Sequence, residues 1–158
     1  MNKEEVTSTD LEAEISRFHK NQSNESLLVL LNKILKCRLV VPCQIRVEPG
    51  YEDRVNNLKK GDSLADLEGV HFVAEILSAS NGTRWIPYFT NGLMMPKKYL
   101  SEYSKMDYKF TEICNQALLD NKDITGIVIN PFNEAFYMDK TMLKLLFDAI
   151  NENKEKDE

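Results

Sequence analysis

The stretch Gly126-Ile-Val-Ile-Asn-Pro-Phe132 decides the fold of this chain. Three β-branched residues in a row are typical of a short strand that is buried on both faces. Gly126 permits a tight strand entry or close packing. Asn130 suits a turn because its side chain can bond to nearby backbone, and Pro131 predicts an extended residue before it. We favour this structural role for Asn130 over ligand binding, because function is argued from a site and not from a fold.

Amphipathic helices are predicted on both sides of this strand. The first is short, begins at Thr9 or Asp10 and ends before Asn21. The second begins at Ser23 or Asn24 and runs to about residue 38. Asp139 is placed to cap the last helix, which follows a short strand at residues 136–138. The apolar stripe of this last helix consists of Met142, Leu143, Leu146, Phe147 and Ile150.

The region between residues 39 and 69 is predicted as a strand followed by a loop. Residues 39–45 have strand composition, and Pro42 indicates an edge position or a bulge because proline has no N–H to donate. Residues 48–69 are polar and contain two Pro/Gly breaks, so they predict a long loop with one helical turn. Loops of this length are often mobile or functional.

Residues 70–79 and 83–90 are predicted to form a hairpin joined by Asn81-Gly82. This dipeptide is typical of a two-residue type I′ turn, in which both positions have positive φ. Both faces of such a hairpin are largely apolar, which predicts that it is covered on both sides. The pairs expected from this turn are Ser80 with Thr83, Leu77 with Ile86, and Ala74 with Phe89.

Two more helices are predicted before the central strand, one begun by Pro96 and one capped by Asp107. The order of elements therefore predicts an α/β (α+β-like) fold, with a mixed sheet of about five strands and helices packed on it. The chain of 158 residues has the size of one domain. We expect frayed tails at residues 1–8 and 152–158.

Composition narrows the classes of function. The net charge of −5 argues against a nucleic-acid partner, which needs a clustered basic surface. No run of 18 apolar residues occurs, so no membrane span is predicted, and no signal peptide is recognised. We therefore expect a cytoplasmic protein. The three cysteines, Cys37, Cys43 and Cys114, are an odd number in apolar contexts and are expected to pack as small hydrophobic residues.

The sequence contains no recognisable catalytic constellation. Its two histidines, His19 and His71, are isolated, and no local motif pairs His71 with a cysteine nucleophile. The cysteine spacing matches no standard zinc site, and the acidic residues of the loop lack the alternation of a calcium loop. No phosphate-binding glycine motif occurs. We predict no catalytic residue, no metal and no cofactor.

Two stretches give the chain a resemblance to a known family. The segment Trp85-Ile-Pro-Tyr-Phe-Thr-Asn91 and the segment from Gly126 to Phe132, followed by Phe136 and a helix, resemble the N-terminal domain of the SseB ("enhanced serine sensitivity") family. Leu39-Val-Val-Pro42 supplies the first strand of that pattern, and the resemblance covers roughly residues 25–151. The tight Asn-Gly turn departs from the longer bend of the family. The resemblance implies a fold more than an activity.

Two hypotheses for function follow, and they use different residues. The first is a non-catalytic binding or regulatory module that acts through a protein partner or self-association, with an aromatic patch near Met94-Met95. Its aromatic residues are Trp85, Tyr88, Tyr99 and Tyr103. Packing of these side chains into the core is the favoured alternative. The second hypothesis is a small-ligand binder or enzyme with a pocket at the strand ends near Thr90, Asn91 and Asn130.

Overall fold

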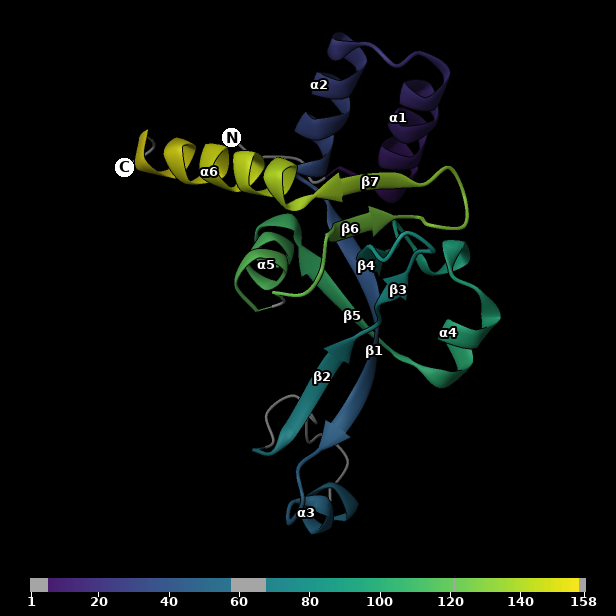
Figure 1. Ribbon diagram of the computed structural model, residues 1–158, viewed down its shortest axis with the longest axis vertical. Helices are drawn as coiled ribbons and strands as arrows, with labels where there is room; N and C mark the ends of the chain where they lie inside the picture. Colours follow the sequence, from purple (N-terminus) through teal and green to yellow (C-terminus); the bar gives the residue numbers. More distant parts are fainter. Residues whose placement is uncertain (1–5, 58–67, 121, 157–158) are drawn as a thin grey trace.

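The computed structural model describes residues 6–57, 68–120 and 122–156, and within them strands and helices form the predicted α+β fold (Figure 1). Two sheets replace the single five-stranded sheet that we expected, with strand orders β2-β1-β5 and β3-β4-β6-β7. The strands are β1 Arg38–Val47, β2 Val70–Ala74, β3 Leu77–Ser78, β4 Arg84–Tyr88, β5 Ser104–Lys109, β6 Gly126–Ile129 and β7 Phe136–Asp139. The helices are α1 Ser8–Lys20, α2 Asn24–Ile34, α3 Glu52–Asn56, α4 Lys97–Glu102, α5 Phe110–Asn115 and α6 Lys140–Lys156, with short turns η2 Gly92–Met94 and η3 Gln116–Asp120.

Strand β6 is one of the two inner strands of the four-stranded sheet, and all four of its residues are buried, as predicted. It runs parallel to β4 and antiparallel to β7. Gly126 is required by close packing, because a Cβ there would lie 2.0 Å from the Met138 carbonyl oxygen. Asp139 caps α6 as predicted, and its Oδ1 accepts a hydrogen bond from the Met142 N–H at 2.9 Å.

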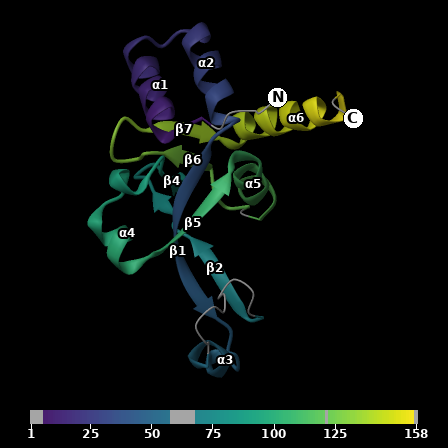
Figure 2. The ribbon, with the colours of Figure 1, turned by 180° about the vertical axis from the view of Figure 1, so that it is seen from behind.

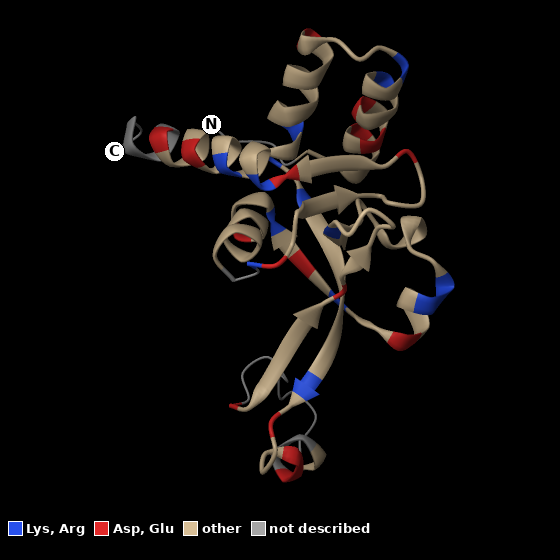
Figure 3. Cartoon of the chain, in the orientation of Figure 1, with Lys and Arg blue, Asp and Glu red and all other residues tan. Residues whose placement is uncertain are grey.

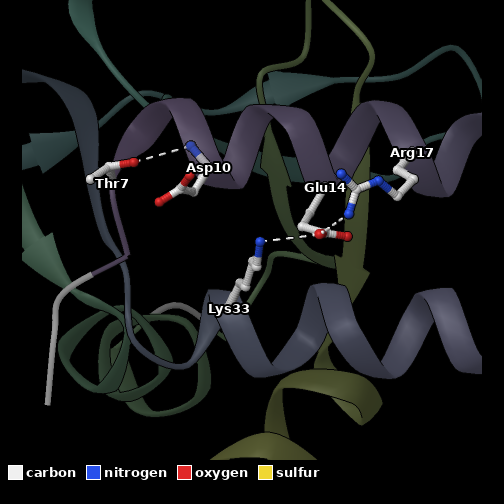
Figure 4. Close-up of polar contacts among 5 residues, drawn as sticks. All are labelled: Thr7, Asp10, Glu14, Arg17 and Lys33. Atoms are coloured by element: carbon white, nitrogen blue, oxygen red, sulfur yellow. Dashed lines mark hydrogen bonds and ion pairs between the residues drawn. The ribbon is translucent and has the colours of Figure 1, made fainter.

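The first two helices form an antiparallel pair above β7 (Figures 1 and 2). Ser23 caps α2 as predicted, but α1 is capped by Thr7, whose hydroxyl accepts from the Asp10 N–H at 3.1 Å. The buried Glu14 carboxylate joins the two helices, since it accepts from Lys33 at 3.1 Å and also pairs with Arg17 (Figure 4). The tails are shorter than expected, because α1 begins at Ser8 and α6 extends to Lys156.

Strand β5 was not predicted, and it replaces the helix cap that we assigned to Asp107. Residues 104–109 alternate between half-buried and exposed, the period of a strand with one covered face. Asp107 lies within this strand, where its carboxylate pairs with Arg38 of β1 at 2.9 Å. Helix α5 instead begins at Phe110, after Lys109. The second predicted helix, α2, ends at Ile34 because β1 already starts at Arg38.

The predicted hairpin is wrong in register and in extent. Leu77 pairs with Trp85, one position away from the pairing that we expected. Gly82 has a φ of +88°, but Asn81 does not have positive φ, so the loop has three residues and Ala79 pairs with Thr83. Of the predicted strand 70–79, only residues 77–78 pair with β4. Strand β2 pairs instead with β1, and Ala74 lies opposite Cys43 rather than Phe89.

Strand β1 is central rather than an edge, and it changes partners at Pro42. Its first six residues pair with β5, and residues 43–47 pair with β2. On the β2 side, Val40 bridges to Phe89 of the other sheet, and the Pro42 carbonyl accepts from the Glu75 N–H at 2.9 Å. The missing N–H of Pro42 therefore falls in the gap between the two partners, where no ladder bond is lost.

Beyond Cys43, β1 and β2 form a two-stranded ribbon that projects from the body and carries α3 near its end (Figures 1 and 2). We call residues 43–47 and 70–74 the arm. Helix α3 confirms the helical turn expected in the polar stretch 48–69, while residues 58–67 of that stretch lie outside the described residues. The arm leaves the body at Cys43, which lies opposite Ser104 at the start of β5.

Candidate functional site

The strand ends named by the sequence hypothesis meet at one edge of the four-stranded sheet. Thr90 and Asn91 follow β4, Asn130 follows β6, and these two strands are parallel. The Thr90 N–H donates to the Asn130 Oδ1 at 3.1 Å, and the Asn130 Nδ2 donates to the Thr90 hydroxyl at 3.1 Å. Thr90 and Asn130 are both buried, so these bonds satisfy polar groups that would otherwise be costly to bury.

Asn130 does not have the extended backbone that we expected before Pro131. Its φ is +51°, in the left-handed region that asparagine tolerates better than most residues. Its N–H donates to the Tyr88 carbonyl at 2.8 Å, and its carbonyl accepts from the Asn133 N–H at 3.0 Å. The tertiary contacts of the side chain and backbone thus override the preference set by proline.

A carboxylate from α1 completes this cluster, and the sequence hypothesis missed it. Glu12 Oε2 accepts from the Thr90 hydroxyl at 2.8 Å and from the Asn91 Nδ2 at 2.7 Å. Glu12 is 78 residues away from Thr90 along the chain. Glu12 lies on a short amphipathic helix, where acidic residues normally face solvent, so no local pattern pointed to it. The described side chains of the cluster bond mainly to one another.

A small hollow of about 50 Å³ adjoins the cluster. A water molecule occupies about 30 Å³ in the liquid, so the hollow has room for one or two waters. Its rim includes the Asn133 Nδ2, which lies 3.3 Å from the Met94 sulfur. The residues around it are Glu12, Ile15, Met94, Asn130, Asn133 and Glu134.

The four aromatic residues of the first hypothesis do not share one surface. Tyr88 lies in the main core, where burial strongly raises the pKa of its hydroxyl. Tyr99 packs with Phe89 and Met95 in a second, smaller core. Trp85 is partly buried and lies edge-on to Tyr137 of β7, with ring centroids 5.0 Å apart. Core packing therefore accounts for Tyr88 and Tyr99, the alternative that we favoured from the sequence.

Exposed apolar side chains nevertheless lie between β4 and β5 and just after β6. Leu93 at the η2 turn is 94% exposed, Leu100 of α4 is 42% exposed, and Phe132 after β6 is 59% exposed. Phe132 lies 6.4 Å from both Phe89 and Tyr99 by ring centroids, so it covers the second core. We call Leu93, Met94, Leu100 and Phe132 the Leu93 surface. Large exposed apolar patches mark interaction sites more often than single exposed residues do.

The cysteine and histidine side chains lie apart. All three cysteines are buried and unbridged, and burial raises the pKa of the Cys37 and Cys114 thiols to about 12 and that of Cys43 to about 11. His71 is exposed and bonds to Glu48 at 2.8 Å, and His19 contacts the Ala135 carbonyl at 2.9 Å. Among the described residues, no three His, Cys, Asp or Glu side chains are grouped to hold a metal ion.

Within residues 6–57, 68–120 and 122–156, no helix has the length and apolar character needed to cross a membrane. Comparison with protein-family models, with curated proteins and with solved structures gave no match to this chain. The resemblance of residues 25–151 to the SseB family therefore stays a prediction.

Proposed function

We propose that this protein is a cytoplasmic, non-catalytic binding module, similar to SseB-family domains, whose Leu93 surface docks a protein partner. The observation that carries the proposal is Leu93, which is 94% exposed at the tip of a turn fixed by buried and half-buried groups. Exposed leucines that are anchored in this way suit an interface, because a partner can bury them without first ordering the chain.

The backbone around Leu93 is held from both sides. The Asn91 Oδ1 accepts from the Leu93 N–H at 2.7 Å, and the Asn91 Nδ2 donates to Glu12. After the turn, the buried Met95 and Tyr99 anchor the chain in the second core. These contacts together restrict the conformation of the turn. A partner that covers Leu93 would therefore gain apolar burial at low cost in conformational entropy.

The rim of the Leu93 surface indicates the chemistry of the partner. Helix α4 exposes Lys97 and Lys98 at its start, and Leu100 follows on the same helix (Figure 3). The chain as a whole carries a net charge of −5, so this basic pair stands out locally. An apolar protein segment that carries acidic residues would complement both features, with the charges assisting encounter and orientation.

Site-specific photocrosslinking in cells tests this proposal. A photoreactive amino acid at position 93 is expected to give one defined crosslinked species, which is lost when Lys97 and Lys98 are both changed to Glu. The matched control is the same amino acid at Leu145, another exposed leucine, which lies on α6 and is 67% exposed. Crosslinking at position 145 to the same partner with the same yield would contradict the assignment of the surface.

The mass of the purified protein in solution distinguishes self-association from binding to a different protein. Light scattering at increasing concentration is expected to give the monomer mass, because the two lysines would face each other in a symmetric pair. A concentration-dependent dimer that Leu93→Asp abolishes would instead assign the Leu93 surface to contacts between copies of this chain. Leu93 is almost fully exposed, so this substitution is expected to leave the fold intact.

A further inference from the structure

A second hollow, larger than the one beside Asn130, lies where the arm leaves the body. Its volume is about 180 Å³, against about 50 Å³ for the first. The residues around it are Gln44, Arg46, Val73, Ala74, Glu75 and Ile76. Gln44 lies opposite Val73 in the β1–β2 register, so these two residues and Arg46 share one face of the ribbon. Neither the sequence hypotheses nor the Leu93 surface uses this hollow.

One end of the hollow carries a fixed carboxylate. Glu75 Oε1 accepts from the Ile76 N–H at 3.0 Å, and Glu75 Oε2 accepts from the Tyr103 hydroxyl at 3.0 Å. Burial and the neighbouring Glu75 carboxylate raise the pKa of Tyr99 to about 12. The hydrogen bond to Glu75 likewise raises the pKa of Tyr103. Both phenols therefore stay protonated at neutral pH and hold the negative charge of Glu75 in one place.

The other end carries the Arg46 guanidinium group, for which the described residues supply no hydrogen-bond or ion-pair partner. Arg46 is exposed, and its side chain makes no ion pair or hydrogen bond with any residue that the structure describes. The nearest acid along the chain is Glu48, just after the end of β1, and its carboxylate is bonded to His71 at 2.8 Å. Arg46 thus presents a planar set of N–H donors of the kind that binds a carboxylate in bidentate fashion.

We propose that this hollow binds a small zwitterion, such as a free α-amino acid. Its carboxylate would bind Arg46, and its ammonium group would bind Glu75. At about 30 Å³ for each water molecule, the volume equals about six waters, which suits a molecule with a few heavy atoms and not a peptide. Val73 and Ile76 supply apolar walls for a small side chain, and Gln44 supplies both a donor and an acceptor. This inference is independent of the Leu93 surface.

Titration followed by amide NMR tests the site on the full chain. The probes are glycine, L-alanine, L-valine, L-serine and L-aspartate, each compared with single-charge analogues, alaninamide and N-acetylalanine. At least one amino acid is expected to shift the amides of residues 44–46 and 73–76, and the analogues are expected to bind at least tenfold more weakly. The proposal fails if no probe shifts these amides at about 10 mM, a concentration that detects even millimolar affinity.

Charge-removing variants then test the two ends separately. Arg46→Gln and Glu75→Gln are each expected to weaken binding by about tenfold or more, since each removes one charged hydrogen-bond partner. Arg38→Gln is the matched control on the same strand, because Arg38 pairs with Asp107 away from the arm, and it is expected to leave binding unchanged. Arg46 is exposed, so its variant is expected to fold normally.

Two results would overturn the assignment. The first is equal affinity in the wild type and in Arg46→Gln, with both proteins showing the same unfolding curve. The second is a set of shifts confined to residues 90–94 and 130–134, which would assign the ligand to the hollow beside Asn130 instead. Tyr103→Phe is expected to weaken binding only a few-fold, because it loosens Glu75 without removing its charge.

Discussion

Strand β6 and the outer part of β1 are both short strand segments, but they lie in opposite surroundings. All of β6 is buried between β4 and β7. Residues 44–47 of β1 have only β2 as a neighbour, and Gln44, Ile45 and Arg46 are all exposed. The difference comes from the number of neighbouring strands and not from the apolar content alone. Strand β1 itself shows this, because its residues 41–43 are buried where β5 still pairs with it.

This contrast indicates that the body of the chain determines stability, while the arm is available for binding. The body buries its polar groups in satisfied clusters, such as Thr90 with Asn130, and these clusters leave little room for a ligand. The base of the arm leaves a larger hollow lined by Arg46, which has no side-chain partner among the described residues. Substitutions in the body should therefore change the free energy of unfolding, while substitutions in the arm should mainly change binding.

The largest effect is expected at the entry of β6. A Cβ at position 126 would lie 2.0 Å from the Met138 carbonyl oxygen and 2.7 Å from the Asp139 Cα, so Gly126→Ala forces the β6–β7 backbones apart. We expect a loss of about 4 kcal/mol or more in the free energy of unfolding, measured by urea denaturation. Gly92→Ala is the control, because its Cβ would meet only the end of Leu100 at 3.9 Å. Similar losses in the two variants would contradict this packing.

An isoleucine pair compares the body with the arm directly. Ile127 of β6 is fully buried, and Ile127→Ala is expected to cost about 3 kcal/mol through lost burial and a cavity. Ile45 of the arm is 37% exposed, and Ile45→Ala is expected to cost less than about 1 kcal/mol. Urea denaturation of both variants measures the difference. Equal losses would show that the apolar face of the arm is packed as tightly as the body.

Much of the body was predictable from the sequence because its signals are local. One such signal is the run of β-branched residues at 127–129, which forms β6. Two others are the polar caps Ser23 and Asp139, each of which stands just before an apolar helical stretch. Strand β5 was missed because Asp107 was interpreted as a helix cap, although residues 104–109 alternate in burial. The alternation is weak in the sequence, since Ser104 and Met106 face the covered side together with Tyr108.

The arm and the polar cluster were less predictable because long-range pairing determines them. The Asn-Gly signal gave a hairpin, but the stretch 70–79 divides at residues 75–76 between two sheets, which no local pattern indicates. Thr90, Asn91 and Asn130 were correctly grouped from the rule on parallel strand ends. Glu12 and Glu75, which bind the hydroxyls of Thr90 and Tyr103, come from distant segments and had no signal of their own.

A smaller effect is expected where β6 ends at Asn130. Asn130→Ala removes the acceptor of the buried Thr90 N–H, and it puts alanine, which tolerates the left-handed region less well than asparagine, at a φ of +51°. We expect a loss of about 2 kcal/mol in the free energy of unfolding. Asn130→Gly loses the same hydrogen bond but tolerates the left-handed backbone, so it should be about 1 kcal/mol more stable than the alanine variant. A glycine variant as unstable as the alanine variant would show that backbone conformation contributes nothing there.

The smallest effect is expected in the reactivity of the thiols, which differs between the body and the base of the arm. Burial raises the pKa of Cys43 to about 11 and that of Cys37 and Cys114 to about 12, from 9.0 for an ordinary thiol. Because the thiolate is the reactive form, Cys43 should be alkylated by iodoacetamide faster than the other two at about pH 8.5. Peptide mass spectrometry over time measures the three rates.

The raised pKa values of the thiols also predict that the free energy of unfolding decreases at high pH. Each thiol holds its proton more tightly in the folded chain than the unfolded value of 9.0, so the unfolded state loses protons first as pH rises above about 9. The free energy of unfolding should therefore fall from about pH 9 up to the folded-state pKa values, about 11 for Cys43 and about 12 for Cys37. Replacing the more strongly shifted Cys37 by Ser should flatten that fall more than replacing Cys43. If Cys43→Ser flattens the fall in stability more than Cys37→Ser does, the thiol at the base of the arm is better shielded from water than the thiol in the body.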